Sequence, residues 1–373
     1  MAARSRNLRK WWLAVHLYLG LTLGLLLSVT GITGSLLVFY VELDEILNPE
    51  LVLAESQSPR LPYEALFQAL KQAEPQRQRG WRLEIPEQPQ QMVMARYYKP
   101  VETEHMGFAP LMVAINPYTA EVVNSRFWGE FAMTWIYDLH YNLLLGASGK
   151  IVMAIVGGLL LVSLLSGLYL WWPAANKWRS ALTFKAHTSI QRWVYDSHKL
   201  SGVYSLIVML MLAITGIALE IPQYFNPLIE VFSPLQAAPK PLSQLTGSVR
   251  ISLDKAVEAA QQQFPDARLC WIETPHDATG SYRINLRQAG EPSRRFPKTN
   301  IWVDQYSAQI LAIQNPNQFK AGDSVLSWFH PLHSGEALAM PGRLLVLLTG
   351  LLCPMLVVTG CWRWLQKRAA SKR

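Results

Sequence analysis

The chain has 373 residues, of which 50% are hydrophobic and only 16% are charged. Soluble proteins carry charge on about a quarter of their residues, so this composition disfavours an ordinary cytosolic enzyme. The deficit predicts long stretches from which lipid excludes charge.

Four runs of the chain contain no Asp, Glu, Lys or Arg. They comprise 31 residues between Lys10 and Glu42, 26 between Lys150 and Lys177, 20 between Lys199 and Glu220, and 19 between Arg343 and Arg363. A helix needs about 20 residues to cross the hydrocarbon core of a bilayer. We therefore predict four transmembrane helices, the first of which is too long for a signal peptide and is expected to be an uncleaved anchor.

The formal net charge of +8 is unevenly distributed along the chain. Residues 1–15, 173–199 and 363–373 hold 14 Lys and Arg against one acid, Asp196, so they carry +13 while the remainder carries −5. Basic residues near membrane spans stay on the cytoplasmic side, which predicts an inner-membrane protein with both termini cytoplasmic. Basic charge of this origin gives no reason to expect a nucleic-acid partner, whereas the spans imply contact with membrane lipid.

Between the spans lie two long segments with mixed helix and strand patterns. Amphipathic helices are predicted near 62–72 and 252–263, each followed by alternating strand patterns. The predicted layout is a cytoplasmic N-terminus with the first transmembrane helix at 1–40, a small periplasmic α+β domain at 41–147, helix two at 148–173, a cytoplasmic loop at 174–197, helix three at 198–221, a second periplasmic α+β domain at 222–340, helix four at 341–364 and a cytoplasmic tail at 365–373. The fold class is a mainly helical membrane protein.

The two halves of the chain repeat each other. At an offset of 182 residues, the matches are His16 with His198, Gly20 with Gly202, and Ile32-Thr33-Gly34 with Ile214-Thr215-Gly216. At an offset of 193, they are Trp135, Leu139, His140, Gly149, Gly167 and Trp171 with Trp328, Leu332, His333, Gly342, Gly360 and Trp364. Both halves cross the membrane in the same sense, which predicts parallel repeats related by a pseudo-twofold axis along the membrane normal.

Four histidines form two repeat-related pairs, His16 with His198 and His140 with His333. A pseudo-twofold axis brings equivalent residues together, so each pair is predicted to supply the two axial ligands of the iron of one b-type haem. An isolated histidine at a helix end is more often an interfacial residue, but these four are repeated. His330 is an alternative to His333, although its repeat counterpart is Tyr137.

The two pairs are expected at opposite faces of the bilayer. His16 and Gly34 are 18 residues apart, which is about 27 Å of helix. No Cys-x-x-Cys-His sequence occurs among the three cysteines, so covalent c-type attachment is excluded.

The His-x-x-x-Gly openings, the Thr-Gly closings, the Leu-His pairs and the Ser/Thr-Gly-x-x-x-Trp exits resemble the PepSY-associated transmembrane family over nearly the whole chain. Within that family the chain is most similar to inner-membrane ferrisiderophore reductases of the FoxB kind. The resemblance implies a haem-dependent ferric-chelate reductase that passes electrons to a periplasmic ferric siderophore and releases Fe(II) for iron uptake.

The sequence has no Gly-rich nucleotide fingerprint after a strand, and its cytoplasmic segments are too short for a flavin or nicotinamide domain. Electrons are therefore expected from a separate donor, either a quinol or a soluble reductase. Two other classes stay open: a siderophore or iron permease component, and a membrane-anchored PepSY interaction module without redox activity. The spans lack the acidic and basic residues that proton-coupled transporters usually keep, and simple anchors give no reason for four paired histidines.

Aromatic and basic residues of the outer segments suit a large anionic chelate, but they also suit the core and surface of small domains. None is assigned to a site; the residues are Trp81, Arg82, Tyr97, Tyr98, Phe127, Trp128, Arg294, Arg295 and Phe296.

Overall fold

The computed structural model describes residues 2–53, 59–185, 189–245, 247 and 249–371. The chain divides into two compact units, each assembled from segments that are far apart in sequence. The helical unit comprises Met1–Phe39, Ile136–Pro227 and Phe329–Arg373, and the sheet unit comprises Tyr40–Trp135 and Leu228–Trp328.

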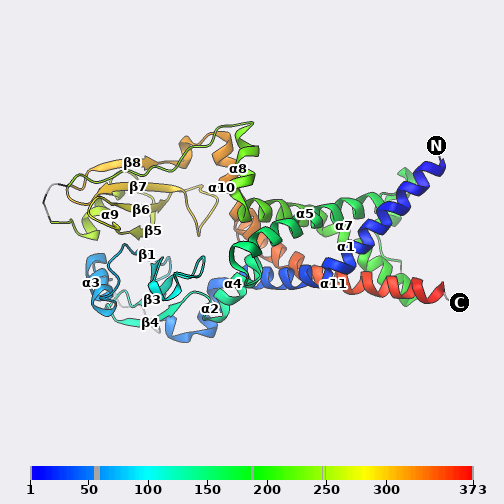
Figure 1. Cartoon of the computed structure of the whole chain (residues 1–373), viewed down its shortest axis with the longest axis horizontal. Helices are drawn as coiled ribbons and strands as arrows, with labels where there is room; N and C mark the ends of the chain where they lie inside the picture. The colour runs from blue at the N-terminus through cyan, green and yellow to red at the C-terminus, as the bar shows by residue number, and fades with distance from the viewer. Residues whose placement is uncertain (1, 54–58, 186–188, 246, 248, 372–373) are drawn as a thin grey trace. The chain divides into compact units, whose positions relative to one another are not determined.

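Four long helices form the helical unit (Figure 1): α1 (Ala2–Leu37), α5 (Gly146–Trp171), α7 (Ile190–Glu220) and α11 (Ala339–Ala370). By length and composition, the segments that can cross a membrane are Asn7–Leu37, Gly146–Trp171, Ile190–Glu220 and Glu336–Ala370. Shorter helices are α4 (Ala132–Asn142), α6 (Trp178–Ala181), α8 (Pro222–Glu230) and α10 (Ala321–Ser334). The chain is therefore a multi-pass membrane protein.

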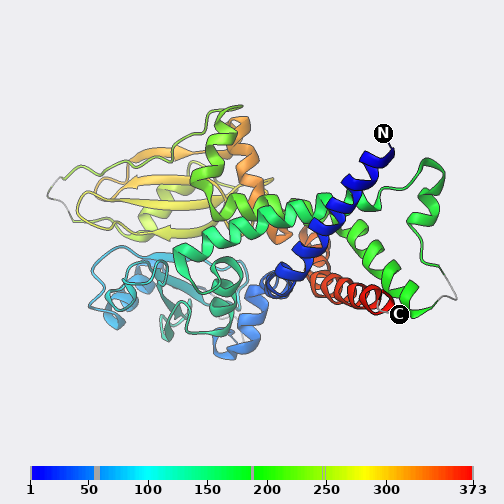
Figure 2. The ribbon, with the colours of Figure 1, turned by 45° about the vertical axis from the view of Figure 1, so that its right-hand side comes forward.

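The four long helices pack as a ring in which α1 contacts α5 and α11, and α7 contacts the same two helices. The turned view in Figure 2 separates α1, in blue, from α11, in red. Helices that are equivalent in the sequence repeat therefore occupy opposite corners of the bundle. This arrangement lets side chains of α1 and α7 meet across its centre.

Helix α7 begins before the predicted span at 198 because hydropathy marks only its apolar part. The Ser189 side chain caps the helix by accepting a hydrogen bond from the backbone N–H of Arg192. The buried Asp196 then pairs with Arg192 at 2.9 Å and with Lys199 at 3.0 Å. Such pairs, one turn apart, stabilise a helix without any hydrophobic periodicity.

The two outer segments build one antiparallel sheet and not two separate domains, which corrects the prediction. The strands lie in the order β4-β3-β2-β1-β5-β6-β7-β8, and the halves join where β1 pairs with β5. The strands are β1 (Arg82–Glu84), β2 (Val93–Tyr97), β3 (Leu111–Ile115), β4 (Val122–Phe127), β5 (Arg268–Glu273), β6 (Ser281–Arg287), β7 (Thr299–Asp304) and β8 (Ile310–Gln314). A four-stranded half exposes an edge that can pair with another strand; pairing the two edges removes both.

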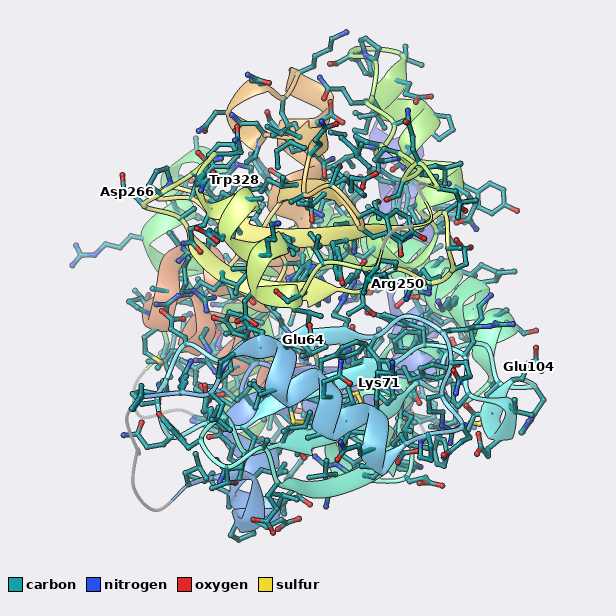
Figure 3. All side chains as sticks on the ribbon, turned by 90° about the vertical axis from the view of Figure 1, so that its left-hand side faces the viewer. Glu64, Lys71, Glu104, Arg250, Asp266 and Trp328 are labelled. Carbon is teal, nitrogen blue, oxygen red and sulfur yellow. The ribbon has the colours of Figure 1, made fainter. Side chains whose placement is uncertain are left out.

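One face of the sheet is covered by α3 (Tyr63–Ala73) and α9 (Leu253–Gln261), which confirms both predicted helices. Alternate strand residues such as Leu83, Val113 and Ile284 point into this core, as the period of two requires. Figure 3 looks onto these helices, with Glu64 and Lys71 marking α3.

The two helices cap each other. The Glu64 carboxylate accepts from the backbone N–H of Leu253 at 2.9 Å, and the Asp254 carboxylate accepts from the N–H groups of Tyr63 and Glu64 at 2.9 and 3.0 Å. An acidic side chain at a helix N-terminus satisfies otherwise unpaired donors and complements the helix dipole. This exchange fixes the two halves of the core against each other.

Candidate histidine-pair site

His16 and His198 meet across the centre of the helical bundle. Their ring centroids are 6.3 Å apart and their planes are inclined by 80°. His16 comes from α1 and His198 from α7, the two helices at opposite corners. The structure thus brings together the first pair that the sequence repeat predicts.

The second pair is formed by His140 of α4 and His333 of α10. Their ring centroids are also 6.3 Å apart, with planes inclined by 55°. His333, and not the alternative His330, is therefore the partner of His140. Burial, the largest cause for both rings, lowers the pKa of each to about 4, and the neighbouring His333 further lowers that of His140. Both imidazoles are consequently neutral at pH 7, as metal ligation requires.

Each ring of the first pair is held through its Nδ1 atom by an adjacent helix. His16 Nδ1 lies 3.0 Å from the Ser163 carbonyl on α5, and His198 Nδ1 lies 3.0 Å from the Leu356 carbonyl on α11. A carbonyl oxygen can only accept, so Nδ1 carries the proton and Nε2 keeps a free lone pair. Metal-ligating histidines commonly donate their second ring N–H to a backbone carbonyl in this way.

The second pair repeats the same arrangement on the other two cradle segments. His140 Nδ1 lies 3.0 Å from the Thr30 carbonyl on α1, and the Leu212 carbonyl on α7 accepts from the backbone-facing nitrogen of His333. Thr215 Oγ1 also lies 3.0 Å from His333 Nδ1. All four rings therefore have the same tautomer, with Nε2 available as a ligand.

A hydroxyl group supports each ring at the same place. Ser166 and Thr359 lie 3.1 Å from the Nδ1 atoms of His16 and His198, and Thr33 lies 3.2 Å from that of His140. Each hydroxyl donates to a carbonyl of its own helix, for example Ser166 to Ser163 at 2.8 Å, and so presents an acceptor to the ring.

The residue after each of these hydroxyls is glycine, which lets the ring approach the helix backbone. A Cβ at Gly34 would lie 2.8 Å from the Cε1 atom of His140, and at the other three glycines the corresponding distance to a histidine Cε1 is 3.1 to 3.3 Å. We call each hydroxyl-glycine dipeptide a histidine cradle; the four are Thr33-Gly34, Ser166-Gly167, Thr215-Gly216 and Thr359-Gly360. The sequence analysis treated these dipeptides only as repeat markers, although their constant offset from the histidines was the signal for this role.

The two pairs lie far apart along the bundle. His16 and the Thr33 cradle of His140 are 17 residues apart on α1, and His198 and Thr215 have the same spacing on α7. This spacing corresponds to about 26 Å of helix.

Several other residues do not join these sites. Arg343 donates to the Val38 carbonyl at 2.8 Å and lies over the Phe39 ring. Among the aromatic residues considered for docking, Trp81, Tyr97 and Trp128 are buried. Of the two central loop histidine and outer-segment positions, His187 lies outside the described residues. In the part of the chain that the structure describes, no group of three or more His, Cys, Asp and Glu is arranged to hold a metal ion.

These features define a multi-pass membrane protein with four long helices, a sheet unit and two buried histidine pairs. The chain matches the PepSY-associated TM region family over residues 13–367, and it belongs to that family. It is also similar to an uncharacterized protein of Pseudomonas aeruginosa, with 25% identity over 268 residues. That match covers 64% of this chain and 65% of the relative's length.

Proposed function

We propose that the protein is a di-haem transmembrane oxidoreductase of the bacterial inner membrane. It passes electrons from a cytoplasmic-side or quinol donor to a periplasmic ferric siderophore and releases Fe(II). The observation that carries the proposal is the identical construction of two histidine pairs at two distant places in one bundle.

The geometry of each pair fits two ligands on opposite sides of one iron. Two imidazoles bound through metal–nitrogen bonds of about 2 Å have ring centres roughly 6.2 Å apart, and both pairs have centroids at 6.3 Å. Because the described residues offer no third protein ligand at either pair, the remaining positions on the metal suit a macrocycle that brings its own nitrogen atoms.

Bound haem supplies reversible one-electron exchange at its iron. The chain's own residues would do the rest. His16 with His198, and His140 with His333, would occupy both axial positions, which leaves no position open to dioxygen. The cradles would hold the rings in the correct tautomer and orientation, and the apolar bundle would keep water out.

The charge distribution supports an outward direction of electron flow. The basic termini and central loop are expected in the cytoplasm, which puts the outer segments on the periplasmic side. A ferric chelate is a suitable acceptor because Fe(II) is softer than Fe(III) and poorly matched to the hard oxygen donors of such chelates. One electron therefore loosens the complex without breaking the ligand.

The test is an anaerobic mixing experiment with the purified full chain. The dithionite-reduced and desalted protein should show haem absorption bands that reoxidise on mixing with a ferric hydroxamate or ferric catecholate siderophore, with Fe(II) trapped by a chromogenic chelator. A chain without a reduced-minus-oxidised haem spectrum would overturn the cofactor assignment. Haems that stay reduced with both classes of siderophore would overturn the acceptor assignment.

A further inference from the structure

The sheet unit contains a cavity of about 240 Å³ on the face opposite α3 and α9. Its walls include Glu84, Met94 and Arg96, which alternate along β1 and β2 with the core residues Leu83 and Ala95. The cavity is closed by α2 (Tyr40–Leu47) and by the segment at 294–296. Every lining residue belongs to the sheet unit.

The four carboxylates of the cavity already have partners. The contacts are Asp44 with Arg126 at 2.8 Å, Glu84 with Arg96 at 2.7 Å, Glu87 with Arg294 at 3.5 Å, and Glu45 with the Gln91 amide at 2.7 Å. The acidic groups are therefore not set up to hold a cation.

Two donors of the cavity wall have no acceptor. The Arg268 Nε and Trp271 Nε1 atoms are buried and make no hydrogen bond with any described residue. Trp271 is 8% exposed, so bulk water reaches little of it. Buried donors are nearly always satisfied in native proteins. A ligand that brings hydrogen-bond acceptors would satisfy both atoms, and the positive charge of Arg268 favours an anion.

The rest of the wall suits a flat apolar body. Tyr40, Trp271 and Phe296 contribute aromatic rings, and the Arg295 guanidinium lies 4.6 Å from the centre of the Tyr40 ring. Three methionines, Met92, Met94 and Met112, also line the cavity. Thioethers adapt to irregular shapes and pack favourably against aromatic rings.

We infer that this cavity binds a small aromatic carboxylate of one or two rings. The carboxylate accepts from Arg268 and Trp271, and the ring system lies among the aromatic and thioether side chains. No electron transfer is involved, and binding does not depend on the histidine pairs. The inference thus goes beyond the proposed function and stands apart from it.

The experiment is calorimetric titration of the full chain in lipid nanodiscs with three probes of one shape: 2-naphthoate, neutral 2-naphthamide and cationic 2-naphthylmethylammonium. We expect 2-naphthoate to bind at one site per chain, the amide at least tenfold more weakly, and the cation not at all. The Trp271→Phe variant keeps the ring but loses the N–H, and Arg268→Gln loses the charge. Both should weaken 2-naphthoate at least fivefold and reduce its preference over the amide.

Arg250→Gln is the matched control, because Arg250 is an exposed arginine of the same unit that does not line the cavity (Figure 3). It should bind 2-naphthoate like the unaltered chain, and so should His16→Ala, whatever its haem content. Equal affinity for 2-naphthoate and 2-naphthamide, or no binding of 2-naphthoate, would overturn the inference on the unaltered chain alone. Unchanged affinity in both Trp271→Phe and Arg268→Gln would refute this cavity as the site.

Discussion

Replacing Gly34 by alanine places a methyl group where the His140 ring packs. The new Cβ would lie 2.8 Å from His140 Cε1 and 3.3 Å from its Nδ1. Carbon atoms in contact are ordinarily about 3.5 Å apart or more, so the ring must move by roughly 0.7 Å. The movement strains the 3.0 Å hydrogen bond to the Thr30 carbonyl.

The energetic balance has two terms. Overpacking costs about 1–3 kcal/mol, whereas alanine in place of glycine favours a helix by about 1 kcal/mol. The net effect is a destabilisation of up to about 2 kcal/mol at the His140 cradle. Metal sites tolerate ligand displacements of only about 0.2 Å, so the variant should lose one of two haems and keep the other.

The assay is the haem-to-protein ratio of the purified variant, together with its thermal unfolding midpoint. Gly20→Ala is the matched control, because Gly20 lies on the same helix and a Cβ there would meet no heavy atom within 4 Å. The control should keep both haems and unfold at or slightly above the unaltered midpoint. If Gly34→Ala behaves like Gly20→Ala in both measurements, the close approach does not position His140 and the reasoning fails.

Further predictions concern the other cradles, the sheet unit and the topology. Ser166→Ala removes the hydroxyl acceptor beside His16 and should weaken haem retention there about tenfold, measured by transfer to apomyoglobin; retention equal to the unaltered chain would contradict it. Asp254→Asn weakens a helix cap and should destabilise the sheet unit by about 1–2 kcal/mol, measured by chemical denaturation. Burial opposes ionisation of Asp304, but backbone N–H donors prevail and lower its pKa below 3.8; its stabilisation is complete above pH 3.8 and is lost as the pH falls further, so Asp304→Asn should flatten the acid limb of the unfolding midpoint between pH 5 and pH 2. A periplasm-dependent reporter fused after Ser180 should give no signal, and a strong signal would reverse the orientation.

Much of the fold was predictable because its signals are local. Charge-free runs located the four long helices, and alternating patterns located strands such as Val93–Tyr97 and Ser281–Arg287. The hairpin after Asn116 and its counterpart after Asp304 also follow from sequence, since Ala120 and Ala308 take the same left-handed turn position, with φ of 61° and 64°. Turn chemistry of this kind depends on a few adjacent residues.

The single sheet was not predictable in the same way. Each half has its own core pattern, and nothing in the short strand Arg82–Glu84 distinguishes a free edge from a paired one. Its pairing with Arg268–Glu273 joins residues about 190 positions apart, and strand pairing at that range leaves no local signature.

The histidine pairing followed from the repeat, whereas the cradles did not. A Thr-Gly or Ser-Gly dipeptide is common in membrane helices, where small residues permit close packing. Only the structure shows that the ring of His16 packs against Gly167 and that of His198 against Gly360. The offset between each histidine and its cradle was present in the sequence, but a helix-packing explanation accounted for the glycines equally well.

The most direct test of the proposed function is the haem content of four purified proteins: the unaltered chain and its His16→Ala, His333→Ala and His330→Ala variants. We predict two haems per chain for the unaltered protein and for His330→Ala, and one haem for each of the other two variants. The His16→Ala and His333→Ala proteins should also differ in the reduced-minus-oxidised spectrum that remains, because each keeps a different site. Two haems in both of those variants, or loss of a haem from His330→Ala with His333→Ala unaffected, would contradict the pairing of His16 with His198 and of His140 with His333.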